Sequence, residues 1–147
     1  MTELRKLLDA VITSKYTDLL ENTFDISYTK IGSHWAKFDE MPFDGYLIEI
    51  DEELKDADDA VKTGFIASVL SQIVRYRDAP LEGKYRYDTL EDCPEEDIIK
   101  NEIENDKETI RRGFRDDLYA AVKFLEGKNY WEDGFSGKEL EELAGIR

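Results

Sequence analysis

The sequence predicts an α+β fold that forms one domain over residues 1–147, and three observations carry this prediction. Apolar residues recur at three- and four-residue steps near the N-terminus and again in the second half of the chain, as in amphipathic helices. Between residues 24 and 50 the apolar period shortens to two, as in half-buried strands. A chain of 147 residues with 7 Phe, 8 Tyr and 2 Trp also has enough apolar bulk for one compact core.

The N-terminal part is predicted to form a helix followed by a small sheet. Residues 4–20 have helical apolar spacing, and the pattern changes beyond Asn22. Three short strands are expected at residues 24–28, 34–38 and 46–50, separated by Gly32 and by the turn at residues 41–45. Because turns of this kind join antiparallel neighbours, the sheet is expected to be mostly antiparallel.

The next helix, predicted at residues 60–76, is unusually apolar. Lys62 and Arg75 are its only formally charged residues, whereas the preceding segment, residues 51–59, holds six acids. A helix that is apolar around most of its circumference is buried on several sides. We therefore expect this helix to be the centre of the core.

The C-terminal half is predicted to be helical. Residues 78–94 form a long connection with room for a flap or short hairpin, and a helix should begin near Pro94. Gly113 is expected to end or kink that helix. Further helical stretches are predicted at residues 116–125 and 138–143.

Composition excludes several classes of function. With 35 acidic and 20 basic residues, the net charge is −15 and the pI is about 4.4, so direct binding to nucleic acid phosphates is not expected. One Cys and one His exclude a disulfide within the chain and any zinc site made only of Cys and His. No segment has the pattern of a signal peptide or membrane span, so a cytoplasmic protein without membrane contact is expected.

The apolar helix carries a polar stripe that needs partners. Four polar residues lie on one face of this helix, because the last three follow the first by three, four and seven positions. An unsatisfied buried hydroxyl or amide costs about 1–3 kcal/mol, and an unpaired guanidinium costs more. Two acids on the following helix, one turn apart, are the expected partners of the guanidinium. The predicted cluster consists of Ser68, Ser71, Gln72, Arg75, Glu102 and Asp106.

The order of these features resembles the gluzincin-type zinc metallopeptidases of the small zincin fold. In that family a strand and an acidic loop precede a buried helix with His-Glu-x-x-His, and a later helix carries Glu-x-x-x-Asp before a glycine break. This chain has Ile48-Glu49-Ile50, the acidic loop, the apolar helix, then Glu102-Ile103-Glu104-Asn105-Asp106 and Gly113. The resemblance covers roughly residues 45–125.

The residues that carry zinc chemistry in that family are replaced here. Ser71 and Arg75 stand where the two histidines would be, and Gln72 stands where the general base would be. A hydroxyl, a guanidinium and an amide neither hold the metal nor take a proton from its water. The resemblance therefore implies a non-catalytic binding or regulatory module without metal or cofactor, in which Arg75 occupies the metal position against Glu102.

Other interpretations remain open at this stage. The polar stripe is also what an ordinary core helix shows when it meets a neighbouring helix. Residues 88–108 hold ten acids and two Lys, which would suit a basic protein partner or mimic nucleic acid phosphates. Carboxylate catalysis near Glu102 and Asp106, and a Cys93–His34 nucleophile pair, are further alternatives. No phosphate-binding glycine loop or calcium loop is present.

Overall fold

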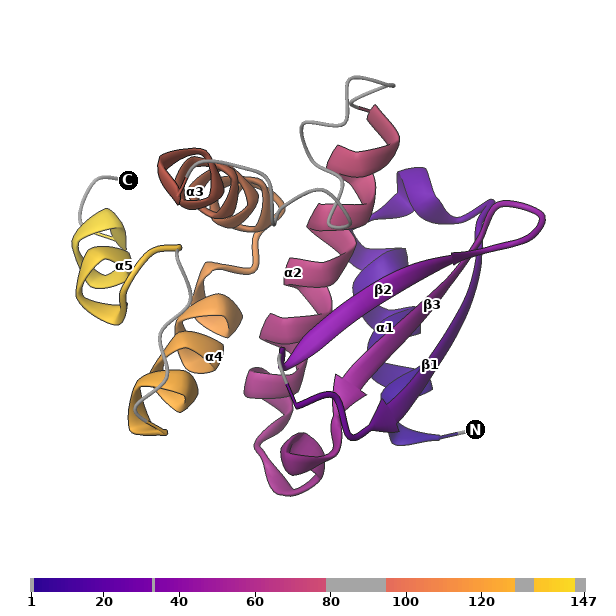
Figure 1. Ribbon diagram of the computed structural model, residues 1–147, viewed down its shortest axis with the longest axis horizontal. Coiled ribbons are helices and arrows are strands. Elements are labelled where there is room, and N and C mark those ends of the chain that lie inside the picture. Colours follow the sequence, from indigo (N-terminus) through magenta and orange to yellow (C-terminus); the bar gives the residue numbers. More distant parts are fainter. Residues whose placement is uncertain (1, 33, 79–94, 129–133, 145–147) are drawn as a thin grey trace.

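The computed structural model describes residues 2–32, 34–78, 95–128 and 134–144 and shows the expected α+β fold (Figure 1). Helices and a small sheet pack into one core, and the part of the chain that the structure describes has no helix long and apolar enough to cross a membrane. The elements, in chain order, are α1 (Glu3–Lys15), the 3-10 helix η1 (Thr17–Leu19), β1 (Thr23–Thr29), β2 (Ala36–Met41), β3 (Gly45–Asp51), the 3-10 helix η2 (Glu52–Asp56), α2 (Asp59–Asp78), α3 (Glu95–Arg111), α4 (Arg115–Gly127) and α5 (Gly137–Ala144).

The three strands form a mixed sheet, which corrects the expectation of a mostly antiparallel one. The strand order is β1-β3-β2; β2 pairs with β3 antiparallel, but β1 pairs with β3 parallel. β3 is the strand with the most buried residues, and the central place gives it hydrogen-bonding neighbours on both sides. The connection from β1 to β2 therefore passes the end of β3, because β2 lies at the opposite edge of the sheet.

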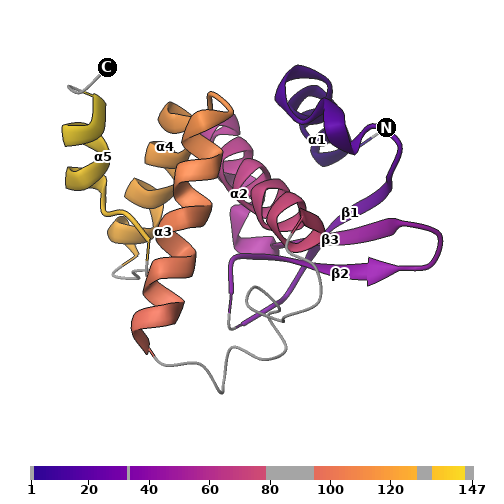
Figure 2. The same cartoon turned by 90° about the horizontal axis from the view of Figure 1, so that it is seen from above.

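One face of the sheet forms part of the core. The strand register aligns Ile26, Ile48 and Phe38 across all three strands, with Phe24 and Tyr46 in the next row. Figure 2 shows α1 and α2 over this face. The opposite face carries mainly polar residues. Among the described elements, helices cover this one face, and strands with one face in the core alternate in sequence.

α2 is the centre of the core, as predicted. It contacts the sheet, α1, α3 and α4, and eleven of its residues are buried. Lys62 is one of them, and its ammonium group pairs with Glu3 at 2.9 Å. Because α2 has neighbours on several sides, its polar groups need hydrogen-bond partners within the protein. The neighbouring elements supply these partners.

Several boundaries differ from the sequence-based expectation. The first helix ends at Lys15, because Tyr16 leaves helical geometry and is fully buried. β2 begins two residues later than expected and continues to Met41, where it still pairs with Gly45. Gly113 ends α3, with φ +95°. The connection at residues 79–94, including Cys93, lies outside the described residues.

α2 and α4 approach each other most closely at Gly64. A Cβ atom at this position would lie 2.2 Å from the backbone oxygen of Asp117 and 2.9 Å from the Cβ of Ala121. Only a glycine leaves room for this distance between the helices. Gly127, at the end of α4, has no heavy atom within 4 Å of its virtual Cβ, which makes it a matched control.

We expect Gly64→Ala to lower the free energy of unfolding by about 1–3 kcal/mol, because the methyl group forces α2 away from α4. Gly127→Ala should be neutral or slightly stabilising, since it only reduces the entropy of the unfolded chain. Urea denaturation of both variants measures the difference. Equal midpoints would contradict the close approach of the two helices.

Candidate functional site

The polar stripe of α2 meets a polar face of α3. The α3 residues buried against it are Asn101, Asn105 and Thr109, spaced one turn apart, whereas Ile99 and Ile103 are only half-buried. The apolar row of α3 is therefore not its most buried side. We call the group of contacts between these two helices the α2–α3 seam.

Arg75 is held in the seam by two asparagines. Its Nη2 donates to Asn101 Oδ1 at 2.8 Å, and its Nη1 donates to the Asn101 carbonyl oxygen at 3.0 Å and reaches Asn105 Oδ1 at 3.5 Å. The expected partners were Glu102 and Asp106, each one residue later. One residue turns a helix by about 100°, so the asparagines occupy a face of α3 next to the one that the sequence favoured.

Ser71 forms the buried centre of the seam. Its Oγ is 2.7 Å from the Tyr16 hydroxyl and accepts from Thr109 Oγ1 at 2.8 Å, and the residue has no exposed surface. The Tyr16 hydroxyl also donates to the carbonyl oxygen of Ala67 at 3.0 Å, and burial raises the pKa of Tyr16 to about 12. Three hydroxyls, from Tyr16 directly after α1, from α2 and from α3, thus satisfy one another.

Asn105 links this centre to Ser68. Its Nδ2 donates to the Ser68 carbonyl oxygen at 3.1 Å and to Ser68 Oγ at 3.3 Å, and its carbonyl oxygen accepts from Thr109 at 3.1 Å. Only 1% of Asn105 is exposed. The Asn105 side chain therefore makes hydrogen bonds from α3 to α2. An apolar side chain at this position would remove these bonds from Ser68 and Arg75.

The remaining predicted site residues lie beside the seam. Gln72 is half-buried on α2. Glu102 and Asp106 line a small cavity of about 30 Å³ between α2, α3 and α4, together with Ser68 and apolar side chains of α2 and α4. The Asp106 carboxylate accepts the backbone N–H of Phe135 at 2.8 Å. Ser71, Gln72 and Arg75 do not line this cavity, so the predicted cluster divides into two groups.

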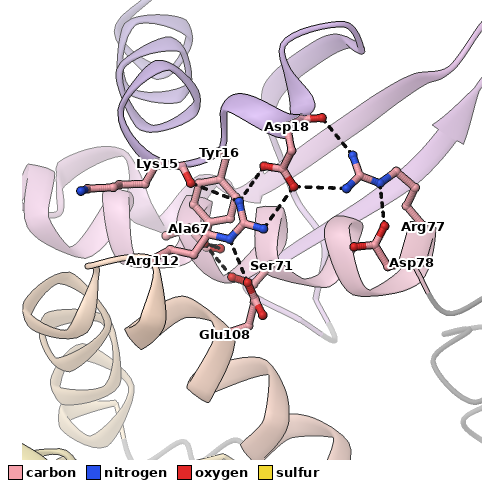
Figure 3. Close-up of polar contacts among 9 residues, drawn as sticks. All are labelled: Lys15, Tyr16, Asp18, Ala67, Ser71, Arg77, Asp78, Glu108 and Arg112. Atoms are coloured by element: carbon pink, nitrogen blue, oxygen red, sulfur yellow. Dashed lines mark hydrogen bonds and ion pairs between the residues drawn. The ribbon is translucent and has the colours of Figure 1, made fainter.

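An ion-pair network that the sequence did not reveal closes one end of the seam (Figure 3). Arg112 donates to Asp18 at 2.7 and 3.1 Å and to Glu108 at 2.8 Å, and its guanidinium lies 4.6 Å from the centroid of the Tyr16 ring. Arg77, at the end of α2, donates to the same Asp18 carboxylate at 3.1 Å. The hydrogen bonds from Arg112 lower the pKa of Asp18. Asp18 therefore joins the ends of α2 and α3 to η1.

The residues of the seam do not fit a zinc ion. The seam presents hydroxyls, amides and a guanidinium, whereas protein zinc sites use imidazoles, thiolates and carboxylates. Across residues 2–32, 34–78, 95–128 and 134–144, no three His, Cys, Asp or Glu side chains gather so that they could hold a metal. His34 is exposed and lies two residues before β2.

Comparisons with known proteins do not assign the chain to a family: it matches no family model, no curated protein and no solved structure. The α+β architecture and the geometry of the seam therefore carry the functional argument.

Replacing Asn105 with Leu should lower the free energy of unfolding by about 1–3 kcal/mol, because the half-buried Ser68 and Arg75 lose the hydrogen bonds that this buried amide makes with them. Lys107→Leu, on the exposed side of the same helix, is the control and should change stability by less than about 0.5 kcal/mol. Chemical denaturation followed by circular dichroism measures both. An unchanged midpoint for Asn105→Leu would show that the seam does not support the fold.

Stability should depend on pH through Asp18. Its folded pKa lies below the ordinary value of 3.8, so its stabilisation is complete above that pH and is lost as the pH falls through the lowered value. Because this side chain is partly exposed, Asp18→Asn should cost only up to about 1 kcal/mol at neutral pH. The difference from wild type should shrink below about pH 4, as urea midpoints at several pH values will show. A difference that is constant with pH, or equal to that of the exposed control Asp39→Asn, would contradict this assignment.

Proposed function

We propose that the protein is a non-catalytic binding or regulatory module, whose α2–α3 helix pair resembles the site of a zinc metallopeptidase that has lost its metal ligands. The observation that carries this proposal is the Arg75 guanidinium, held between the two helices by Asn101 and Asn105. In the family that the sequence resembles, the corresponding face holds a metal. Here a fixed positive charge with amide partners lies on that face.

The register of the seam supports a closer correspondence than the sequence suggested. Asn101 and Asn105 are one turn apart and contact the stripe of α2, as Glu-x-x-x-Asp would in the metallopeptidases. On this alignment each carboxylate is replaced by an amide: Asn105 has the shape of the Asp, and Asn101 is one methylene shorter than the Glu. Neutral amides do not compensate the charge of a dication, but they satisfy an arginine by hydrogen bonds. None of the aligned positions therefore carries a negative charge.

The chemistry of the seam favours binding over hydrolysis. Gln72 cannot act as a general base, and Ser71 has no exposed surface through which a substrate could reach it. The cavity beside Glu102 and Asp106, at about 30 Å³, has room for water but not for a peptide or sugar. A basic protein partner, the alternative that composition suggested, is compatible with this role because the chain carries a net charge of −15.

Restoring the ligands tests the proposed scaffold. We expect a restored variant to bind one zinc ion, measured by competition with a chromophoric chelator, whereas the wild-type protein purifies without stoichiometric metal. The restored variant combines Ser71→His, Gln72→Glu, Arg75→His and Asn101→Glu. The matched control has Asn101→Gln in place of Asn101→Glu and should bind zinc roughly tenfold or more weakly, because the third ligand is missing.

The buried position of Ser71 requires a check on folding. Circular dichroism must show wild-type helix content for both variants. If the restored variant does not fold, Arg75→His with Asn101→Glu keeps Ser71 and should still raise zinc affinity over wild type. A folded restored variant without zinc affinity, or wild-type protein that holds stoichiometric zinc, would contradict the proposal.

A further inference from the structure

The tip of the β2–β3 hairpin departs from the conformation that its residues favour. Residues 42–44 connect Met41 to Gly45, which are paired across the two strands. Phe43 has φ +63° and Asp44 has φ +58°, the left-handed region that Gly and Asn adopt easily and that bulky side chains rarely occupy. Turn chemistry alone would favour Asn and Gly at these two positions.

The Phe43 side chain is also 96% exposed. Its ring therefore gains nothing from burial in the core, while its backbone is strained. Figures 1 and 2 show the hairpin tip at the outer edge of the molecule, away from α3, α4 and α5. A residue that costs stability both through its backbone and through its exposed ring is better explained by a contact outside the chain.

A second exposed apolar residue lies on the segment that is hydrogen-bonded to the tip. In the part of the chain that the structure describes, the large hydrophobic residues with high exposure are Phe43 and Leu20, the latter at 56%. The Asn22 side chain donates to the carbonyl oxygen of Asp44 at 2.9 Å and so joins the segment after η1 to the hairpin. These two apolar side chains, which we call the hairpin patch, therefore lie at one end of the molecule on connected segments.

Acidic residues lie on the segments that carry the hairpin patch. Glu21, Glu40 and Asp44 are all exposed on the segments that carry it. Together with a net charge of −15, these carboxylates repel a second copy of this chain and an anionic membrane surface. They attract a surface with lysine or arginine side chains, and they raise the rate of association with it.

We propose that the hairpin patch is the contact surface for a protein partner with an apolar pocket bordered by basic side chains, an inference that rests on the binding role proposed above. Phe43 enters the pocket as an aromatic anchor, Leu20 packs at its edge, and the surrounding carboxylates pair with the basic border. Aromatic anchors in a desolvated pocket with a polar rim are the usual centres of protein interfaces. The strained turn holds the ring outward before the partner arrives.

The first experiment needs no partner. Phe43→Asn should raise the urea midpoint, because Asn adopts the left-handed region with less strain and exposes no ring to water. Phe38→Asn is the control; this half-buried ring packs on Tyr46 and Tyr76, so its loss should lower the midpoint. A lower midpoint for Phe43→Asn would show that Phe43 supports the fold and would overturn the proposal.

The second experiment identifies the partner. A photoreactive benzophenone derivative of phenylalanine is placed at position 43 or 20, and at Thr13 on α1 or Lys123 on α4 as exposed controls. We expect one protein to be crosslinked in cells from positions 43 and 20 but not from the controls. With that protein purified, calorimetry should show binding about tenfold or more weaker for Phe43→Asn than for wild type, and weaker for both at higher ionic strength.

The outcomes separate this proposal from the proposed function. Crosslinks only from Thr13 or Lys123, to a lipid, or to a second copy of this chain would overturn the hairpin patch and leave a binding role intact. An absence of crosslinks from all four positions would contradict the binding role as well. The zinc experiment bears only on the scaffold, so its failure would leave a crosslinked partner valid.

Discussion

The need to satisfy polar groups inside α2 governs the arrangement of the elements around it. This helix is buried against the sheet and against three other helices, yet it carries Ser68, Ser71 and Arg75 on one face. Buried polar groups without hydrogen bonds are costly, so the neighbours must supply them. Tyr16 leaves the end of α1 to reach Ser71, and α3 turns its asparagines toward α2. The same requirement thus sets the end of one helix and the rotation of another.

The parts of the fold that periodicity controls could be predicted from the sequence. The change from helical to alternating spacing near Asn22, the apolar α2 and the glycine that ends α3 each have a local cause. The parallel pairing of β1 with β3 could not be predicted from the sequence. The order of strands in the sheet depends on which strand has the most buried residues and not on the order along the chain. The role of Tyr16 could not be predicted for a related reason, since it depends on a hydroxyl partner 55 residues away in the sequence.

The candidate site was predicted from charge, with Glu102 and Asp106 as the expected partners of Arg75. The structure shows two neutral amides, Asn101 and Asn105, in contact with the guanidinium, and charge complementarity gives no reason to select them. A usable signal was present: Asn101, Asn105 and Thr109 form an uncharged polar stripe at four-residue spacing that matches the stripe of α2. Asp18 and Arg112, 94 residues apart, gave no such signal.

The central position of β3 also fixes the order in which the sheet can assemble. β2 and β3 are joined by a three-residue turn and can pair as soon as both have formed. β1 is made first, but among the described strands its neighbour is β3, so its strand-to-strand hydrogen bonds cannot form until β3 has been synthesised. During translation the earliest strand is therefore the last to be paired. The polar residues Asp25, Ser27 and Thr29 along β1 make this delay tolerable, because an exposed strand edge with such residues aggregates less readily than an apolar one.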